Sequence, residues 1–94
     1  MEYEILHDKK AMKFYTEIDG EQAFLRYLPT GEGTLDFIKT FVPPAGRGKG
    51  LAALLMQAGL DYARETGARI RPSCSYVAKY FQDHPEVSSL REQD

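Results

Sequence analysis

Hydrophobic and polar side chains alternate along the first half of the chain, which is the spacing of β-strands with one buried face. The alternation is clearest over residues 12–19, where Phe14 and Ile18 fall on the apolar face. Asp19-Gly20 then favours a hairpin turn. Strand-like runs also cover residues 3–8, 22–28 and 34–42. Because only short turns separate these four runs, they predict a meander of antiparallel strands.

After Pro44 the hydrophobic spacing changes to that of an amphipathic helix. No proline interrupts the helical pattern, and Gly67 stands where a helix commonly ends, so we expect a helix over 49–66. A fifth strand at the start of 68–74 and a short helix over 75–82 follow it. Together these elements predict an α+β fold: a mostly antiparallel five-stranded sheet, a long helix after the fourth strand and a short helix after the fifth.

Composition limits the class of protein that these elements can build. The 94 residues suit one small domain spanning 1–94, whose polar tail over 88–94 is expected to fray. No apolar run approaches the ~20 residues of a membrane span, and the start Met1-Glu2-Tyr3-Glu4 lacks the pattern of a signal peptide, which favours a cytoplasmic location. The single cysteine excludes an internal disulfide, and the net charge of −2 argues against a dedicated nucleic-acid binder.

Three glycines in five residues mark the junction between the fourth strand and the long helix, within Val42-Pro43-Pro44-Ala45-Gly46-Arg47-Gly48-Lys49-Gly50-Leu51-Ala52. Such a turn lets the backbone approach an anion, and the first turn of a helix presents unpaired N–H groups and the positive end of its dipole. A Walker-type loop needs Ser or Thr directly after Gly-Lys, and a dinucleotide fingerprint needs a parallel βαβ unit; neither is present. The junction therefore indicates another phosphate site, or else a plain connection with a solvated basic tip.

The residues from Arg47 to Ala52 carry a resemblance. Arg47-Gly48-Lys49-Gly50-Leu51-Ala52 resembles the Arg/Gln-x-x-Gly-x-Gly/Ala signature of the GNAT superfamily of acyl-CoA-dependent N-acetyltransferases. The segments 71–76 and 80–86 are similar to a branch of very small, single-domain members. The resemblance implies that Arg47 and the backbone amides of Gly48, Lys49, Gly50, Leu51 and Ala52 hold the pyrophosphate of acetyl-CoA. It also implies that Thr40-Phe41-Val42 pairs with the pantetheine arm where the fourth and fifth strands part.

Acetyl transfer to an amine needs a base, oxyanion donors and a proton for the departing thiolate. The resemblance offers Asp36 as the base, although a solvated strand residue is the plainer interpretation. The usual proton donor is a tyrosine, but the matching position here is Gln82, so Tyr76 and Tyr80 are substitutes that could equally be packing residues. Cys74 is either a nucleophile or assisting thiol with a lowered pKa, or a buried inert residue.

The function that these observations favour is acetyl-CoA binding and acetyl transfer to a primary amine. Only the short connection from Asp8 to Ala11 links the first two strands, where larger members insert helices, so an amine on a protein or peptide is favoured as acceptor. The main alternative is a non-catalytic acyl-CoA-binding module or sensor, and a more distant one is an RNA-binding module. No spacing of His, Cys, Asp or Glu suggests a metal site, and the sequence does not name the acceptor or the oligomeric state.

Overall fold

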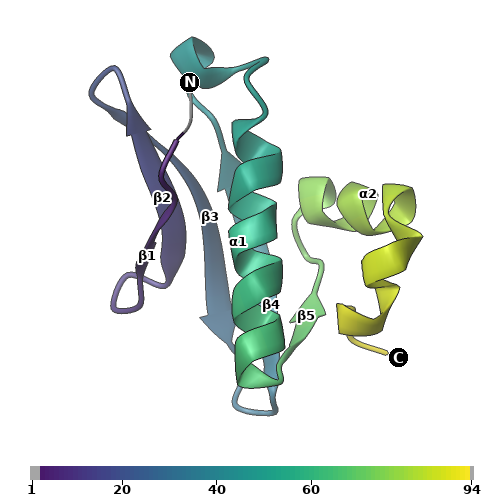
Figure 1. The fold of residues 1–94 in the computed structure, drawn as a ribbon. Helices are drawn as coiled ribbons and strands as arrows, with labels where there is room; N and C mark the ends of the chain where they lie inside the picture. The colour runs from purple at the N-terminus through teal and green to yellow at the C-terminus, as the bar shows by residue number, and fades with distance from the viewer. Residues whose placement is uncertain (1–2, 94) are drawn as a thin grey trace.

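A computed structural model describes residues 3–93, whose strands form one five-stranded sheet in the order β1-β2-β3-β4-β5 (Figure 1). The elements are β1 (Leu6–Asp8), β2 (Lys13–Ile18), β3 (Glu21–Pro29), β4 (Thr34–Phe41), η1 (Pro44–Gly46), α1 (Leu51–Thr66), β5 (Arg69–Arg71), α2 (Ser75–Asp83) and η2 (Pro85–Leu90). Neighbouring strands are antiparallel except for β4 and β5, which are parallel. The predicted α+β fold with a mostly antiparallel sheet is therefore confirmed.

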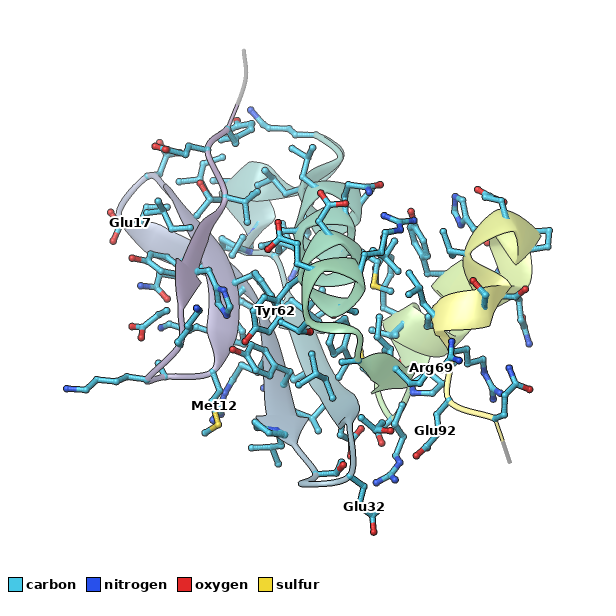
Figure 2. The ribbon with its side chains drawn as sticks, turned by 60° about the horizontal axis from the view of Figure 1, so that its bottom comes forward. Met12, Glu17, Glu32, Tyr62, Arg69 and Glu92 are labelled. Atoms are coloured by element: carbon cyan, nitrogen blue, oxygen red, sulfur yellow. The ribbon has the colours of Figure 1, made fainter. Side chains whose placement is uncertain are left out.

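One face of the sheet is covered by α1, and the core lies between them (Figure 1). The apolar stripe of α1 puts Leu55, Met56 and Leu60 against the strands, where each is fully buried. Gly59 allows the closest approach, because a Cβ there would lie only 2.7 Å from the ring of Phe37. Tyr62 also projects from α1 over the strands (Figure 2). No helix within residues 3–93 is long and apolar enough to cross a membrane.

Two element starts differ from the sequence prediction by two or more residues. The first strand begins at Leu6 rather than at residue 3, and β1 pairs with β2 over three residues. The long helix begins at Leu51 rather than at residue 49, because Gly50 has a left-handed φ of 76° and precedes the helix as its N-cap. Gly48 has a similar φ of 77°, so the glycine-rich segment is a turn that stops just before the helix.

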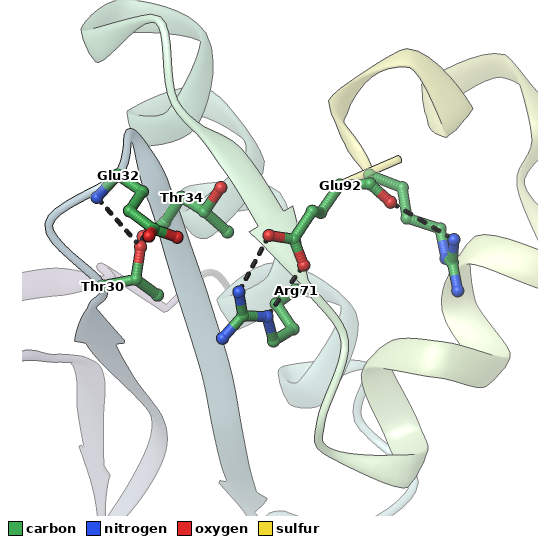
Figure 3. A network of polar contacts seen from close by, with 6 residues as sticks. Thr30, Glu32, Thr34, Arg71 and Glu92 are labelled. Atoms are coloured by element: carbon green, nitrogen blue, oxygen red, sulfur yellow. Dashed lines mark hydrogen bonds and ion pairs between the residues drawn. The ribbon is translucent and has the colours of Figure 1, made fainter. Parts of the chain in front are cut away.

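The C-terminal tail is held against the sheet, which differs from the frayed tail expected from its polar composition. Residues 85–90 form η2, Arg91 bridges to Ile70, and the Glu92 N–H donates to the Ile70 carbonyl at 2.8 Å. Arg71 and Glu92 form a two-bond ion pair at 2.8 and 2.9 Å (Figure 3). Backbone pairing with β5 therefore orders residues 91–92, while Asp94 lies outside the described residues.

A β-bulge interrupts β4 just before the point where the site is built. Arg26 pairs with Lys39 but the next residue, Tyr27, pairs with Phe37, so Ile38 is an extra residue in β4. The parallel pairing of β4 with β5 ends at Asp36 and Arg71. We call this region the fork: it consists of Ile38 to Phe41 of β4 and the neighbouring segment that leads from β5 to Cys74. Within the described residues, no strand pairs with β4 on that side beyond Asp36.

Candidate active site

The turn before α1 forms a hollow, and three of its seven lining residues are glycines. The hollow has a volume of ≈ 200 Å³ and is lined by Val42, Gly46, Arg47, Gly48, Gly50, Leu51 and Ala52. The first bond of the helix runs from the Leu54 N–H to the Gly50 carbonyl, so the N–H groups before Leu54 have no partner in the helix. The N-cap residue, Gly50, has no side chain that could cap this helix end. The hollow therefore combines a concave backbone surface with the positive end of a helix, a combination that suits a phosphate group.

The two basic residues of the turn have different surroundings. Arg47 lines the hollow, and its Nε donates to the Val42 carbonyl at 3.1 Å, which holds the side chain over the turn. Lys49 instead lines a separate hollow together with Glu17 and Asp19. Of the two basic residues of the turn, only Arg47 lines the hollow before α1, so an anion bound there would meet one guanidinium and the backbone amides.

Cys74 and Thr40 meet at the fork. The Cys74 Sγ lies 3.5 Å from the Thr40 Oγ1, and the Cys74 N–H donates to the Phe37 carbonyl at 2.9 Å. The backbone bond to Phe37 fixes Cys74 to β4 at the bulge. The contact with Thr40 directs the Cys74 sulfur along the unpaired end of that strand. The structure thus brings together two of the expected site residues, one expected in catalysis and one in pantetheine binding.

The pKa of the Cys74 thiol is lowered by its surroundings. Burial is the largest influence and raises the pKa, but the Thr40 hydroxyl and the backbone N–H groups of Val77, Tyr76 and Thr40 favour the thiolate and together outweigh it. Cys74 is the N-cap of α2, and no cap hydrogen bond of standard geometry reaches its side chain. The two helix amides therefore act as nearby dipoles at a helix N-terminus, which stabilise negative charge.

Asp36 does not lie with this group. It pairs with Leu28 on β3, whereas Thr40 pairs with Leu25, so the two side chains are on opposite faces of the sheet. The Oδ1 atom of Asp36 is buried and has no hydrogen-bond partner among the described residues. Asp36 is therefore separated from the Cys74 sulfur by the sheet itself.

The two candidate tyrosines have unequal access to the fork. The Tyr80 ring stacks on His84 with 3.9 Å between ring centroids, and the Nδ1 of His84 lies 2.9 Å from the Tyr80 carbonyl. Tyr76 is half-buried and close to Cys74; burial, followed by the charges of Tyr80 and Cys74, raises the pKa of its hydroxyl. Its position in the first turn of α2, two residues after Cys74, makes Tyr76 the better placed of the two tyrosines as a proton donor. Gln82, at the position usual for that tyrosine, is exposed.

Sequence reasoning missed the role of the bulge and the partnership between the Thr40 hydroxyl and the Cys74 sulfur. These two residues are 34 positions apart. No local pattern signals their contact, since it depends on the register shift at Ile38 and on where β5 ends. Metal chemistry has no support in the described residues, where no group of three or more His, Cys, Asp or Glu side chains could hold an ion.

A meander followed by a glycine-rich turn, a long helix and a parallel fifth strand that parts from the fourth is the architecture expected of acyl-CoA-dependent N-acetyltransferases. Comparison with known proteins supports this class. Residues 13–90 match the family described as GCN5-related N-acetyl-transferase. The chain belongs to that family, and the predicted resemblance is confirmed.

Relatives of similar size extend the comparison. Protein NATD1 of Xenopus tropicalis is 35% identical over 81 residues, covering 84% of this chain and 74% of the relative. The human Protein NATD1 is 33% identical over 81 residues, covering 84% and 72%. A solution structure from Staphylococcus aureus, described as GCN5-like, superimposes with a TM-score of 0.73 at 22% identity, covering 97% of this chain and 89% of that one. The last likeness supports the fold.

Proposed function

We propose that this protein binds acetyl-CoA and transfers its acetyl group to a primary amine. The observation that carries the proposal is the closeness along the chain of two features: Val42 lines the hollow before α1, and Thr40, two residues earlier, meets Cys74 at the fork. Both lie along the end of β4, so a ligand with a pyrophosphate at one end and a thioester at the other could occupy both. Acetyl-CoA has this form, and it would supply an activated acetyl group.

The hollow fits a pyrophosphate because the glycines in its lining leave the backbone accessible to an anion. Ideal Cβ atoms built at Gly48 and Gly50 meet nothing within 4 Å, but both residues have left-handed φ angles that side chains disfavour. Their role is thus conformational: they aim the amides of the turn and of α1 into the hollow. Arg47 adds a charge that is already oriented by its bond to the Val42 carbonyl.

At the fork, residues of this chain would donate a proton and stabilise negative charge during acetyl transfer. The acceptor nitrogen forms a bond to the acetyl carbon and loses a proton, while the carbon–sulfur bond breaks and the departing thiolate takes up a proton. Tyr76 is a suitable donor for that proton, because it lies in the first turn of α2 close to Cys74 and a tyrosine hydroxyl is protonated at neutral pH. Cys74 itself, with a lowered pKa, either takes the acetyl group first or assists direct transfer.

Calorimetric titration with CoA and acetyl-CoA tests the binding half of the proposal. Arg47→Ala should weaken CoA binding roughly tenfold, because it removes a charge-assisted contact. Lys49→Ala is the matched control: it removes the same charge from the same turn but lines another hollow, so we expect a change below about threefold. Absence of CoA binding at millimolar ligand, or equal losses in the two variants, contradicts the proposed site.

Release of free CoA thiol with a panel of amines and lysine peptides tests the transfer half. Cys74→Ala separates the two routes, since an acetyl group added to the intact wild-type mass should be absent from this variant if Cys74 is acetylated. The alternative, a non-catalytic acyl-CoA-binding module, is favoured by Gln82 at the usual tyrosine position and by the engagement of Tyr80 with His84. It predicts CoA binding without thiol release.

A further inference from the structure

The face of the sheet opposite α1, here called the outer face, has no helix across β1, β2 and β3 (Figure 1). Three of the four exposed large hydrophobic side chains in the described residues lie on this face: Leu6 at 44%, Leu28 at 41% and Phe41 at 37% exposure. Apolar side chains on a surface without a covering layer indicate a contact face when they are contiguous. The strand register decides whether they are.

Two rows of side chains cross the outer face from strand to strand. Leu6 is opposite Tyr15, Tyr15 opposite Phe24, and Phe24 opposite Phe41, which makes a continuous apolar row over β1 to β4. The adjacent row is basic, because Lys13 is opposite Arg26 and Arg26 is opposite Lys39. Directly opposite residues of antiparallel strands share a face, with Cβ atoms about 5 Å apart. The outer face thus pairs an apolar row with a basic row.

A concave surface lies on the basic row. A hollow of ≈ 440 Å³ is lined by Lys10, Lys13, Phe24 and Arg26, among others, which combines cationic ends with an aromatic floor. This volume lies within the range of sites that hold ligands or side chains of a partner. Met12, from the turn between β1 and β2, also lines it (Figure 2).

The carboxylates of the outer face leave the basic row with a net positive charge. Asp8 stands opposite Lys13, but its Oδ1 accepts the Ala11 N–H at 2.9 Å. Glu17 is paired with Gln22, beyond the apolar row, and Asp36 is opposite Leu28. None of the three forms an ion pair with a residue of the basic row in the described part of the chain. An acidic partner would therefore be electrostatically complementary.

We propose that the outer face docks an acidic protein segment in which a large apolar side chain stands beside carboxylates, and that this segment supplies the acceptor amine. The apolar row ends at Phe41, where the edge of β4 is not paired with β5, so a segment on that row reaches the edge of the sheet around which Thr40 and Cys74 lie on the opposite face. The acceptor role rests on the proposed function, whereas docking itself stands on the two rows.

Ring geometry favours a peptide over a single-stranded nucleic acid. Stacked bases need open ring faces. The rings of Phe24 and Phe41 pack against each other, with centroids 5.7 Å apart and ring planes inclined by 36°. The Lys13 Nζ lies 5.3 Å from the Tyr15 ring centroid and donates to the Gln22 Oε1, so it covers that ring. The carboxylates of a peptide need only basic side chains to bind to, and its apolar side chain needs only apolar surface. The outer face offers both.

Fluorescence anisotropy tests docking with a short labelled peptide of glutamate and phenylalanine that contains one lysine. The double variant Arg26→Glu/Lys39→Glu should weaken binding roughly tenfold, because both exposed charges are reversed in the basic row. The matched control, Arg64→Glu/Lys79→Glu, makes the same change in net charge on α1 and α2 and should leave affinity within about twofold. Circular dichroism and CoA titration establish that each variant is folded.

Several outcomes overturn the proposal. These are no binding of the acidic peptide, equal losses in the two double variants, or equal affinity for the same peptide with glutamine in place of glutamate. Tighter binding of oligothymidylate that is lost in the Arg26→Glu/Lys39→Glu variant would assign the face to nucleic acid, and a dimer that this variant dissociates would assign it to a second copy. Peptide binding is measured without CoA, so a protein that binds CoA but not the peptide refutes docking alone.

Discussion

Replacing Gly59 by alanine should destabilise the protein, against the usual effect of that change in a helix. In an ordinary helix interior, Gly→Ala stabilises by about 1 kcal/mol. Here the added Cβ would lie 2.7 and 2.8 Å from two ring carbons of Phe37 and 3.3 Å from the Leu25 Cδ2. Carbon atoms at optimal contact are roughly 3.5–4.0 Å apart. The ring or the helix must therefore move by several tenths of an ångström inside a packed core.

The expected size of the effect follows from these two opposing contributions. Overpacking a core by one methyl group costs roughly 1–3 kcal/mol, and helix propensity returns about 1 kcal/mol. The free energy of unfolding should fall by about 1 kcal/mol, which for a domain of this size lowers Tm by roughly 4–8 °C. Urea unfolding and a thermal scan measure both quantities.

Ala53→Gly is the matched control, because Ala53 is exposed on the same helix and its change isolates helix propensity. This variant should lose about 1 kcal/mol. If Gly59→Ala instead gains stability by a similar amount, the close approach of α1 to Phe37 is not a constraint and the reasoning fails. The Phe37 carbonyl holds the Cys74 N–H, so a displaced β4 should also change the alkylation rate of Cys74.

Three other predictions concern single contacts. Thr40→Val should raise the pKa of Cys74, because it removes the hydroxyl that favours the thiolate. Alkylation of Cys74 by iodoacetamide should then slow at neutral pH, and the pH profile of the alkylation rate should move to higher pH. An unchanged profile would show that the hydroxyl does not act on the sulfur. The hydrogen bonds and charge of Arg71 lower the pKa of Glu92, so the stability contributed by that pair should be present above pH 4.5 and be lost as pH falls through the lowered value. Glu92→Gln should remove this dependence, as urea midpoints at neutral and acidic pH would reveal. Burial, followed by the charge of Lys9, lowers the pKa of His7. The stability that neutral His7 contributes should therefore be complete above pH 6.5 and decline below it. A Tm difference between wild type and His7→Gln that does not shrink on acidification would contradict this.

Much of the fold follows from hydrophobic spacing, because the buried faces here are regular. The two-residue period of β2 puts Phe14 and Ile18 in the core, and the helical period of α1 does the same for Leu55. The start of the helix was predicted two residues early, since residues 48 and 50 adopt left-handed angles that composition alone does not reveal. The polar composition of the tail gives no signal of its order, which comes from the backbone bond between Glu92 and Ile70 and from Leu90 packing against the core.

The candidate site was only partly accessible from the sequence. The glycine-rich turn is a local motif, so its position before a helix could be predicted from residues 46–52. The role expected of Lys49 is through its backbone amide; Lys49 lines a different hollow with Glu17 and Asp19, because side-chain direction at a turn is set by three-dimensional neighbours. The single-domain organisation and the roles of the site residues stay predictions.

The bulge in β4 explains why the side chains at the fork do not alternate between the two faces of the sheet as they would in a regular strand. In a regular strand Asp36, Ile38 and Thr40 would share one face. The extra residue at Ile38 reverses the alternation, so Asp36 stays on the outer face while Thr40 turns toward Cys74. The same reversal puts Phe41 on the outer face, in line with Phe24. One inserted residue thus places the partner of the thiol on one side of the sheet and the end of the proposed docking row on the other.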